Sequence, residues 1–175
     1  HWEMELSSYL KWKEIILKFF KENNNYNLIF SPHPLVGHLS IKIGYEIKEK
    51  NIVEDNILVD MGSNQCLDGT YTSIADIYIG DISSMVTEWV LQKPRPCIFI
   101  NAHNVDWKDN DNYYMWKFGK VVNTLKEFEE SIIDTTSHNQ YEKIQKKLKN
   151  EFIYTADKSS SDLFAEFITK KVCQT

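Results

Sequence analysis

The clearest pattern of apolar and polar positions lies between Ala75 and Asn101, and it predicts a strand, a helix and a second strand. The first strand is the apolar run 77–79, and the second is the apolar run 97–100, which follows two helix-ending prolines. Between the strands, apolar residues recur at helical spacing at Met85, Val86, Trp89 and Val90. Two strands and a helix of this length are typical of a parallel βαβ unit.

Strands and helices alternate along the rest of the chain as well. Further short strands are expected at 27–30, 57–59 and 120–123, and helices at 5–21, 37–50, 125–133, 140–150 and 160–172. Thr124 and Glu127 have the spacing of a capping box, and the last helix is expected to pack back on the sheet. The polar and aromatic stretch 101–118 is interpreted as a surface loop. This order predicts an α/β fold, a Rossmann-like open parallel sheet with helices on both faces.

The amino-acid composition limits which ligands and partners the protein is expected to bind. The formal net charge of −5 argues against binding nucleic acid by charge alone, so we expect no nucleic-acid partner. Because Arg95 is the only arginine, a bound phosphate must be held by hydroxyl groups, backbone N–H groups and lysine. The three cysteines lack disulfide or zinc spacing, which favours free thiols in a reducing, cytoplasmic compartment.

The chain reads as one piece of a larger protein. Its 175 residues are enough for one domain with a hydrophobic core, and we find no internal repeat. The sequence begins at His1 without a methionine and shows neither a signal peptide nor an apolar run of membrane-spanning length. We therefore expect residues 1–175 to form a single domain excised from a longer protein.

Two polar loops follow predicted strands and could hold a ligand. One contains His33 between two prolines, and the other contains Ser83 and Ser84 at the start of a helix. The carboxyl ends of parallel strands share one edge, where ligands bind, and a helix N-terminus with hydroxyl groups suits phosphate. Taken singly, the serines are better explained as helix caps and His33 as a loop residue; taken together, the two loops favour a phosphate site.

Three further features bear on a nucleotide. Glu88, one turn into the same helix, could accept hydrogen bonds from a ribose diol, although a solvated glutamate is a serious alternative. The loop with Asp60, Met61 and Gly62 is a weaker candidate for contact with the base. The sequence has no HExxH or GxGxxG spacing, so we expect neither a metal nor a dinucleotide cofactor.

Three motifs occur in a recognisable order, SPHP, ADIYIGDISSMVTE and KPRPCIF. Together they resemble the C-terminal, donor-binding half of GT-B glycosyltransferases, in particular the CDP-glycerol glycerophosphotransferases of teichoic acid and capsule synthesis. Bacterial sialyltransferases and polysialyltransferases are similar in the same places. The resemblance covers residues 26–133, and it implies that His33, Ser83 and Ser84 contact the donor's phosphate. Glu88 matches a ribose-binding position of proteins similar to UDP-GlcNAc 2-epimerases.

The resemblance implies a bacterial transferase that moves glycerol phosphate or a sugar from a CDP-, CMP- or UDP-activated donor onto a cell-surface polymer. His33 would act in catalysis through a hydrogen bond to the donor, which is a substrate, and no further cofactor is expected. A missing N-terminal domain would bring the acceptor and the catalytic base, so this piece alone is expected to be inactive. The full enzyme would contact the cytoplasmic membrane face only peripherally.

Two alternatives stay open at this point. A sugar-nucleotide enzyme similar to UDP-GlcNAc 2-epimerase shares the donor half. A non-catalytic phosphate- or protein-binding α/β domain, in which the serines only cap a helix, would bind no nucleotide.

Overall fold

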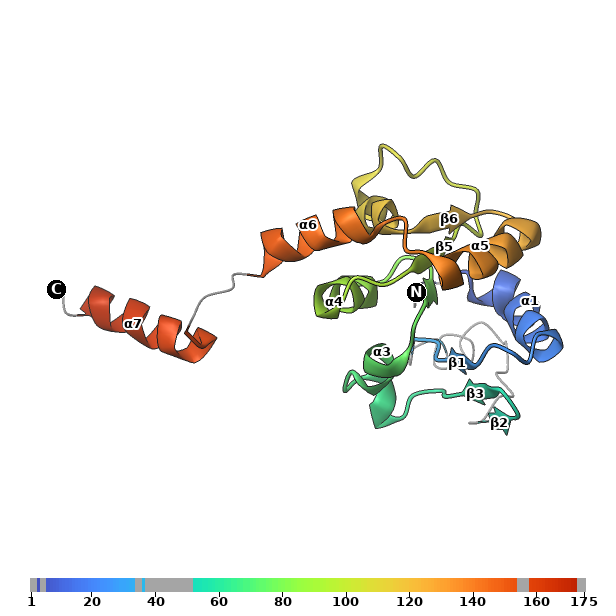
Figure 1. The fold of residues 1–175 in the computed structure, drawn as a ribbon, viewed down its shortest axis with the longest axis horizontal. Coiled ribbons are helices and arrows are strands. Elements are labelled where there is room, and N and C mark those ends of the chain that lie inside the picture. The colour runs from blue at the N-terminus through green and yellow to red at the C-terminus, as the bar shows by residue number, and fades with distance from the viewer. Residues whose placement is uncertain (1–2, 4–5, 34–35, 37–51, 154–157, 173–175) are drawn as a thin grey trace.

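The computed structural model describes residues 3, 6–33, 36, 52–153 and 158–172. The helix expected at 37–50 lies outside these residues. The described strands form two three-stranded sheets, with the orders β1-β3-β2 and β4-β5-β6 (Figure 1). The strands are β1 (Leu28–Phe30), β2 (Ile52–Glu54), β3 (Ile57–Val59), β4 (Tyr78–Gly80), β5 (Cys97–Ile100) and β6 (Lys120–Val122).

The predicted βαβ unit is confirmed. Helix α4 (Met85–Gln92) connects β4 to β5, and these two strands are parallel, with Gly80 opposite Phe99. Strand β6 extends the same sheet in parallel, and β1 is parallel to β3 in the other sheet. The α/β class therefore holds.

Strand β2 departs from the expected all-parallel arrangement because it is antiparallel to β3. Only Asp55 and Asn56 lie between the paired residues Glu54 and Ile57, and a connection this short can join only antiparallel strands. Asp55 has φ 33°, a left-handed conformation that aspartate tolerates better than most residues.

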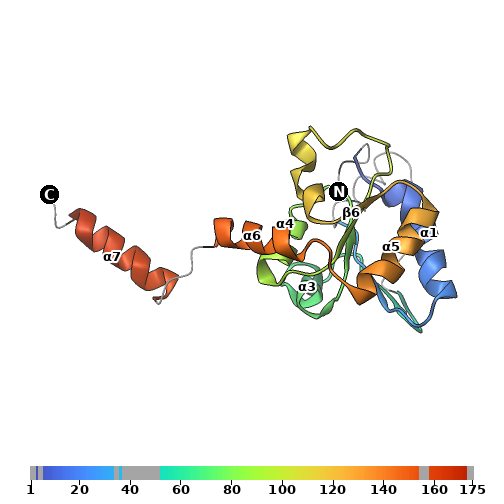
Figure 2. The same cartoon turned by 45° about the horizontal axis from the view of Figure 1, so that its top comes forward.

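Helices cover both faces of the β4-β5-β6 sheet, as expected (Figures 1 and 2). Strand β5 alternates between two hydrophobic clusters, because successive side chains of a strand point to opposite faces. Ile98 and Ile100 join the cluster with α1 (Tyr9–Glu22) and α5 (Leu125–Ser137). Cys97 and Phe99 join the cluster with α4, α6 (Glu142–Phe152) and η2 (Asp111–Phe118). The predicted capping box of Thr124 and Glu127 begins α5.

The segment 111–118 is not the surface loop that the sequence suggested. It forms the 3-10 helix η2, in which Tyr113, Trp116 and Phe118 are buried. The Trp116 ring stacks on that of Phe99, with ring centroids 6.2 Å apart. A 3-10 helix has no 3.6-residue apolar period, which is why its many polar residues suggested a loop.

The buried amide of Gln145 fastens α6 to the sheet. Its Nε2 atom donates to the carbonyl oxygens of Arg95, at 2.9 Å, and of Phe118, at 2.7 Å. The Arg95 guanidinium lies 3.5 Å from the centroid of the Trp89 ring and donates to the carbonyl oxygen of Ala75. The only arginine is thus used in packing near the amino end of β5, at the edge opposite the predicted site.

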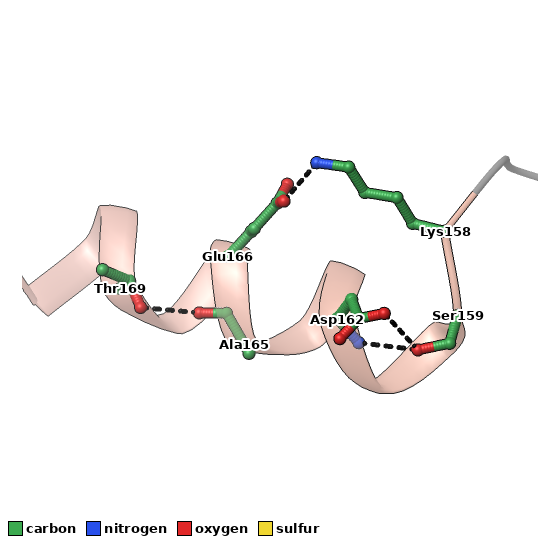
Figure 3. A network of polar contacts seen from close by, with 6 residues as sticks. All are labelled: Lys158, Ser159, Asp162, Ala165, Glu166 and Thr169. Carbon is green, nitrogen blue, oxygen red and sulfur yellow. Dashed lines mark hydrogen bonds and ion pairs between the residues drawn. The ribbon is translucent and has the colours of Figure 1, made fainter.

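Helix α7 (Ser160–Val172) buries no residue and extends away from the sheets (Figure 1), so the expectation that it packs back on the sheet is wrong. Polar contacts within the segment stabilise the start of α7 (Figure 3). Ser159 Oγ accepts a hydrogen bond from the backbone N–H of Asp162, and Lys158, which precedes the helix, forms an ion pair with Glu166. An amphipathic pattern indicates which face of a helix is apolar but not what covers that face. None of the described helices is long and apolar enough to cross a membrane.

Candidate donor site at the carboxyl edge of the sheets

The first turn of α1 brings together the carboxyl ends of strands from both sheets. Next to β4, the backbone N–H and the hydroxyl of Ser8 donate to Asp81 Oδ2 at 2.7 and 2.9 Å. Next to β1, the Tyr9 ring lies against that of Phe30, with ring centroids 6.1 Å apart. The loop with His33 follows Phe30 and the Ser83–Ser84 turn follows Asp81, so each begins after a residue that contacts the start of α1. No direct hydrogen bond between His33 and the two serines is found among the described residues.

Asp81 connects several elements at this edge. The residue is only 6% exposed, and while its carboxylate accepts from Ser8, its carbonyl oxygen accepts from Trp116 Nε1 at 3.3 Å. A carboxylate at a helix N-terminus satisfies backbone N–H groups and complements the helix dipole. Asp81 therefore ties α1 and η2 to the segment just before the serine turn. Sequence reasoning did not assign this role, and an acidic residue directly after a buried strand was the only signal for it.

The two serines differ in how their hydroxyl groups are used. Ser83 Oγ accepts a hydrogen bond from the Met85 backbone N–H at 3.2 Å, within the turn. Ser84 is the exposed N-cap residue of α4 and makes no side-chain capping bond, although its carbonyl oxygen accepts from the Thr87 N–H. Helix capping thus accounts for Ser83 but not for the hydroxyl of Ser84, which is open to a ligand.

Tyr78 and Gly80, on strand β4, lie next to the serine turn. A Cβ atom on Gly80 would lie 2.5 Å from the Tyr78 hydroxyl oxygen, so only glycine leaves room for that hydroxyl. Burial raises the pKa of Tyr78, the nearby charge of Asp81 raises it further, and a hydrogen bond with Ser83 only partly opposes both. Tyr78 therefore stays protonated and keeps a hydrogen-bond donor next to the turn.

His33 and Glu88 are both exposed at the positions that the sequence indicated. The His33 carbonyl oxygen accepts from the Val36 N–H at 2.8 Å, and partial burial lowers the pKa of the imidazole. A neutral imidazole still offers one N–H donor to a phosphate. Glu88 lies in the first turn of α4, after Ser84. Contact of these two residues with a donor stays a prediction.

The carboxylate of Asp60 shapes its own loop. It accepts from the backbone N–H groups of Gly62, at 3.1 Å, and Ser63, at 2.8 Å, and from the hydroxyl groups of Ser63 and Tyr71. Gly62 has φ 131°, which favours glycine, and Met61 packs against the α1–α5 cluster. Asp60 thus fixes the loop, and contact of this loop with a base stays a prediction.

Hydrogen bonds decide the ionisation of Asp60. Burial alone raises the pKa of this carboxyl, but the bonds from Ser63, Tyr71 and Gly62 outweigh burial and lower the pKa well below its usual value. The carboxylate form is therefore the one that the fold stabilises. No group of acidic, histidine or cysteine side chains suited to a metal ion is found within the described ranges.

The family assignment rests on a match that runs through this whole edge. Residues 7–170 match the family model described as CDP-glycerol:poly(glycerophosphate) glycerophosphotransferase. The chain belongs to this family. No curated protein and no solved structure matches the chain.

Membership of this family implies a nucleotide-activated donor as the class of substrate. The family match is wider than the resemblance seen in the motifs, because it includes α1 and reaches into α7. It contains every predicted site residue and the first turn of α1 that the motifs did not reveal. The match favours a transferase over an epimerase or a non-catalytic domain.

The Asp81 junction can be tested by its effect on stability. Asp81→Ala leaves the buried N–H and hydroxyl of Ser8 without this acceptor, and we expect the free energy of unfolding in urea to fall by about 1–3 kcal/mol. Asp76→Ala, at an exposed aspartate of the same segment, is the matched control and should change little. Equal stability of Asp81→Ala and wild type would contradict the junction role.

Asp60 predicts a defined pH dependence. Since its folded-state pKa is lowered, its stabilisation is complete above the unfolded pKa of about 3.9 and is lost as the pH falls through the lower folded-state value. Asp60→Asn should therefore be less stable than wild type by a constant amount between about pH 5 and 7, and this difference should shrink below about pH 4. Urea unfolding across this range measures both curves, and a constant difference down to about pH 2 would refute the assignment.

Proposed function

We propose that this chain is the donor-nucleotide-binding domain of a bacterial transferase that moves glycerol phosphate from CDP-glycerol onto a cell-surface polymer. The observation that carries the proposal is the exposed hydroxyl of Ser84 at the N-terminus of α4, in a turn whose start is fixed by Asp81. Backbone N–H groups of a first helical turn have no intrahelical partner and favour anions. The family match supplies the class of donor.

The proposed reaction transfers a phosphoryl group. An acceptor hydroxyl attacks the phosphorus atom that carries glycerol, the bond from that phosphorus to the oxygen of CMP breaks, and the acceptor's proton goes to a base. Negative charge develops on the CMP phosphate as it leaves. Ser83, Ser84 and the N–H groups of α4 would donate hydrogen bonds to that phosphate, which stabilises the leaving group in the transition state.

The other predicted residues have supporting roles in this proposal. His33 donates a hydrogen bond to the donor's phosphate, Glu88 accepts hydrogen bonds from the ribose hydroxyls, and the Asp60–Gly62 loop borders the base. The donor is itself a substrate, and no additional cofactor takes part. An N-terminal domain would present the acceptor and the base, so the described domain binds the donor without turnover. The complete enzyme would work in the cytoplasm at the membrane face.

Calorimetric titration tests the proposal with CDP-glycerol, CMP and UDP-GlcNAc as ligands. We expect CDP-glycerol to bind, and Ser84→Ala to weaken its binding about tenfold through loss of a hydrogen bond to a charged group. The melting temperature should hardly change, because Ser84 makes no side-chain capping bond. Ser161→Ala, at an exposed serine on α7, is the control and should bind as wild type does.

Three results would contradict the proposal. Absence of CDP-glycerol binding would remove the donor-binding role, and selective binding of UDP-GlcNAc would favour an enzyme of the epimerase type. Equal affinity of wild type and Ser84→Ala for CDP-glycerol would remove Ser84 from the site.

A further inference from the structure

The ammonium group of Lys11 is held at the carboxyl edge of the sheet by a carbonyl oxygen and an imidazole nitrogen. Lys11 Nζ donates to the carbonyl oxygen of Ala102 at 2.9 Å and lies 3.3 Å from His103 Nδ1. Within the part of the chain that the structure describes, no carboxylate is paired with it. Lys11 is exposed, so a ligand can reach its charge.

The contacts of His103 indicate which tautomer the site favours. Because an ammonium group only donates, His103 Nδ1 must accept from Lys11. His103 Nε2 lies 3.0 Å from the carbonyl oxygen of Ser7, which only accepts, so Nε2 carries the proton. His103 therefore bridges Lys11 and the backbone of Ser7, and it orients the ammonium group.

Register places the ends of β4 and β5 side by side, and the start of α1 contacts the residues that follow both strands. Gly80 of β4 is paired with Phe99 of β5, and Ser83 and Ala102 each lie three residues beyond those partners. Ser8, which is bonded to Asp81, precedes Lys11 by one helical turn, so both residues lie on the same face of α1. The contacts of this face thus reach the ends of both β4 and β5.

The charge of the proposed ligand requires such a cation. A diphosphate carries negative charge that the two neutral serines cannot balance, and the only arginine packs on Trp89 at the other edge. On the same helix, Lys13 is buried, 3.5 Å from Glu14, and Lys18 is paired with Glu22. Lys11, in contrast, directs its ammonium group to the residues that follow β5 at this edge.

We propose that Lys11, positioned by His103 and Ala102, binds the donor's phosphate groups and neutralises part of their charge. This inference rests on the proposed function, because it assigns a further residue to the same site. A charge-assisted hydrogen bond from lysine to phosphate is stronger than a neutral one, and it weakens as salt screens the charge.

Ligands with different numbers of phosphate groups distinguish phosphate binding by Lys11 from a purely structural role of this residue. Affinities of cytidine, CMP and CDP-glycerol are measured by NMR titration for wild type, Lys11→Gln, Lys11→Arg and the control Lys18→Gln. We expect Lys11→Gln to weaken CDP-glycerol about tenfold, CMP less and cytidine not at all. Lys11→Arg should retain most of the affinity, and Lys18→Gln should match wild type. Melting temperatures verify that each variant is folded.

The outcomes separate this inference from the proposed function. If wild type binds CDP-glycerol and folded Lys11→Gln binds it equally well, the role of Lys11 is overturned and the donor site stands. The role of Lys11 is also overturned if Lys11→Gln weakens cytidine and CDP-glycerol by the same factor, since that loss does not depend on phosphate. If wild type binds no CDP-glycerol, the proposed function fails and the role of Lys11 fails with it.

Discussion

The hydrogen bonds between Asp81 and Ser8 are the contact on which the carboxyl edge depends. Residues 73 positions apart in the sequence meet there, in a buried setting where an unpaired carboxylate or N–H group is costly. The bonds fix the start of α1 against the end of β4, and through Tyr9 and Phe30 the same helix end reaches β1. The start of α1 thereby anchors the residues from which loops of both sheets begin.

Polar residues at this edge fall into two groups, those that bond within the protein and those that face the solvent. Asp81 and Ser83 use their polar groups to bind the protein's own backbone, while Ser84 presents a hydroxyl and Lys11 presents a charge to the solvent. The internally bonded residues hold the solvent-facing residues in place, and a preorganised anion site requires such support. The family implies a nucleotide-activated donor, and we propose that its phosphate groups bind at this edge.

Local patterns in the sequence were sufficient for the βαβ unit, the Thr124–Glu127 capping box and the α/β class, because each depends on residues close in the chain. The same reasoning failed for η2, whose burial comes from aromatic contacts with β5, and for α7, whose apolar face finds no cover among the described residues. The motifs pointed to Ser83 and Ser84 but not to Lys11. Its contact with His103 joins residues 92 positions apart, and no local spacing encodes that.

The most direct test of the proposed donor site is an NMR titration that follows backbone amide shifts of the isotope-labelled protein as CDP-glycerol is added. We predict that the largest shifts occur at the amides of Ser83 to Met85, with further shifts around His33 and the first turn of α1. Amides of α6 and α7 should shift little. Shifts concentrated on α6 or α7, or no saturable shift at all, would contradict the claim that the carboxyl edge built on Asp81 holds the donor.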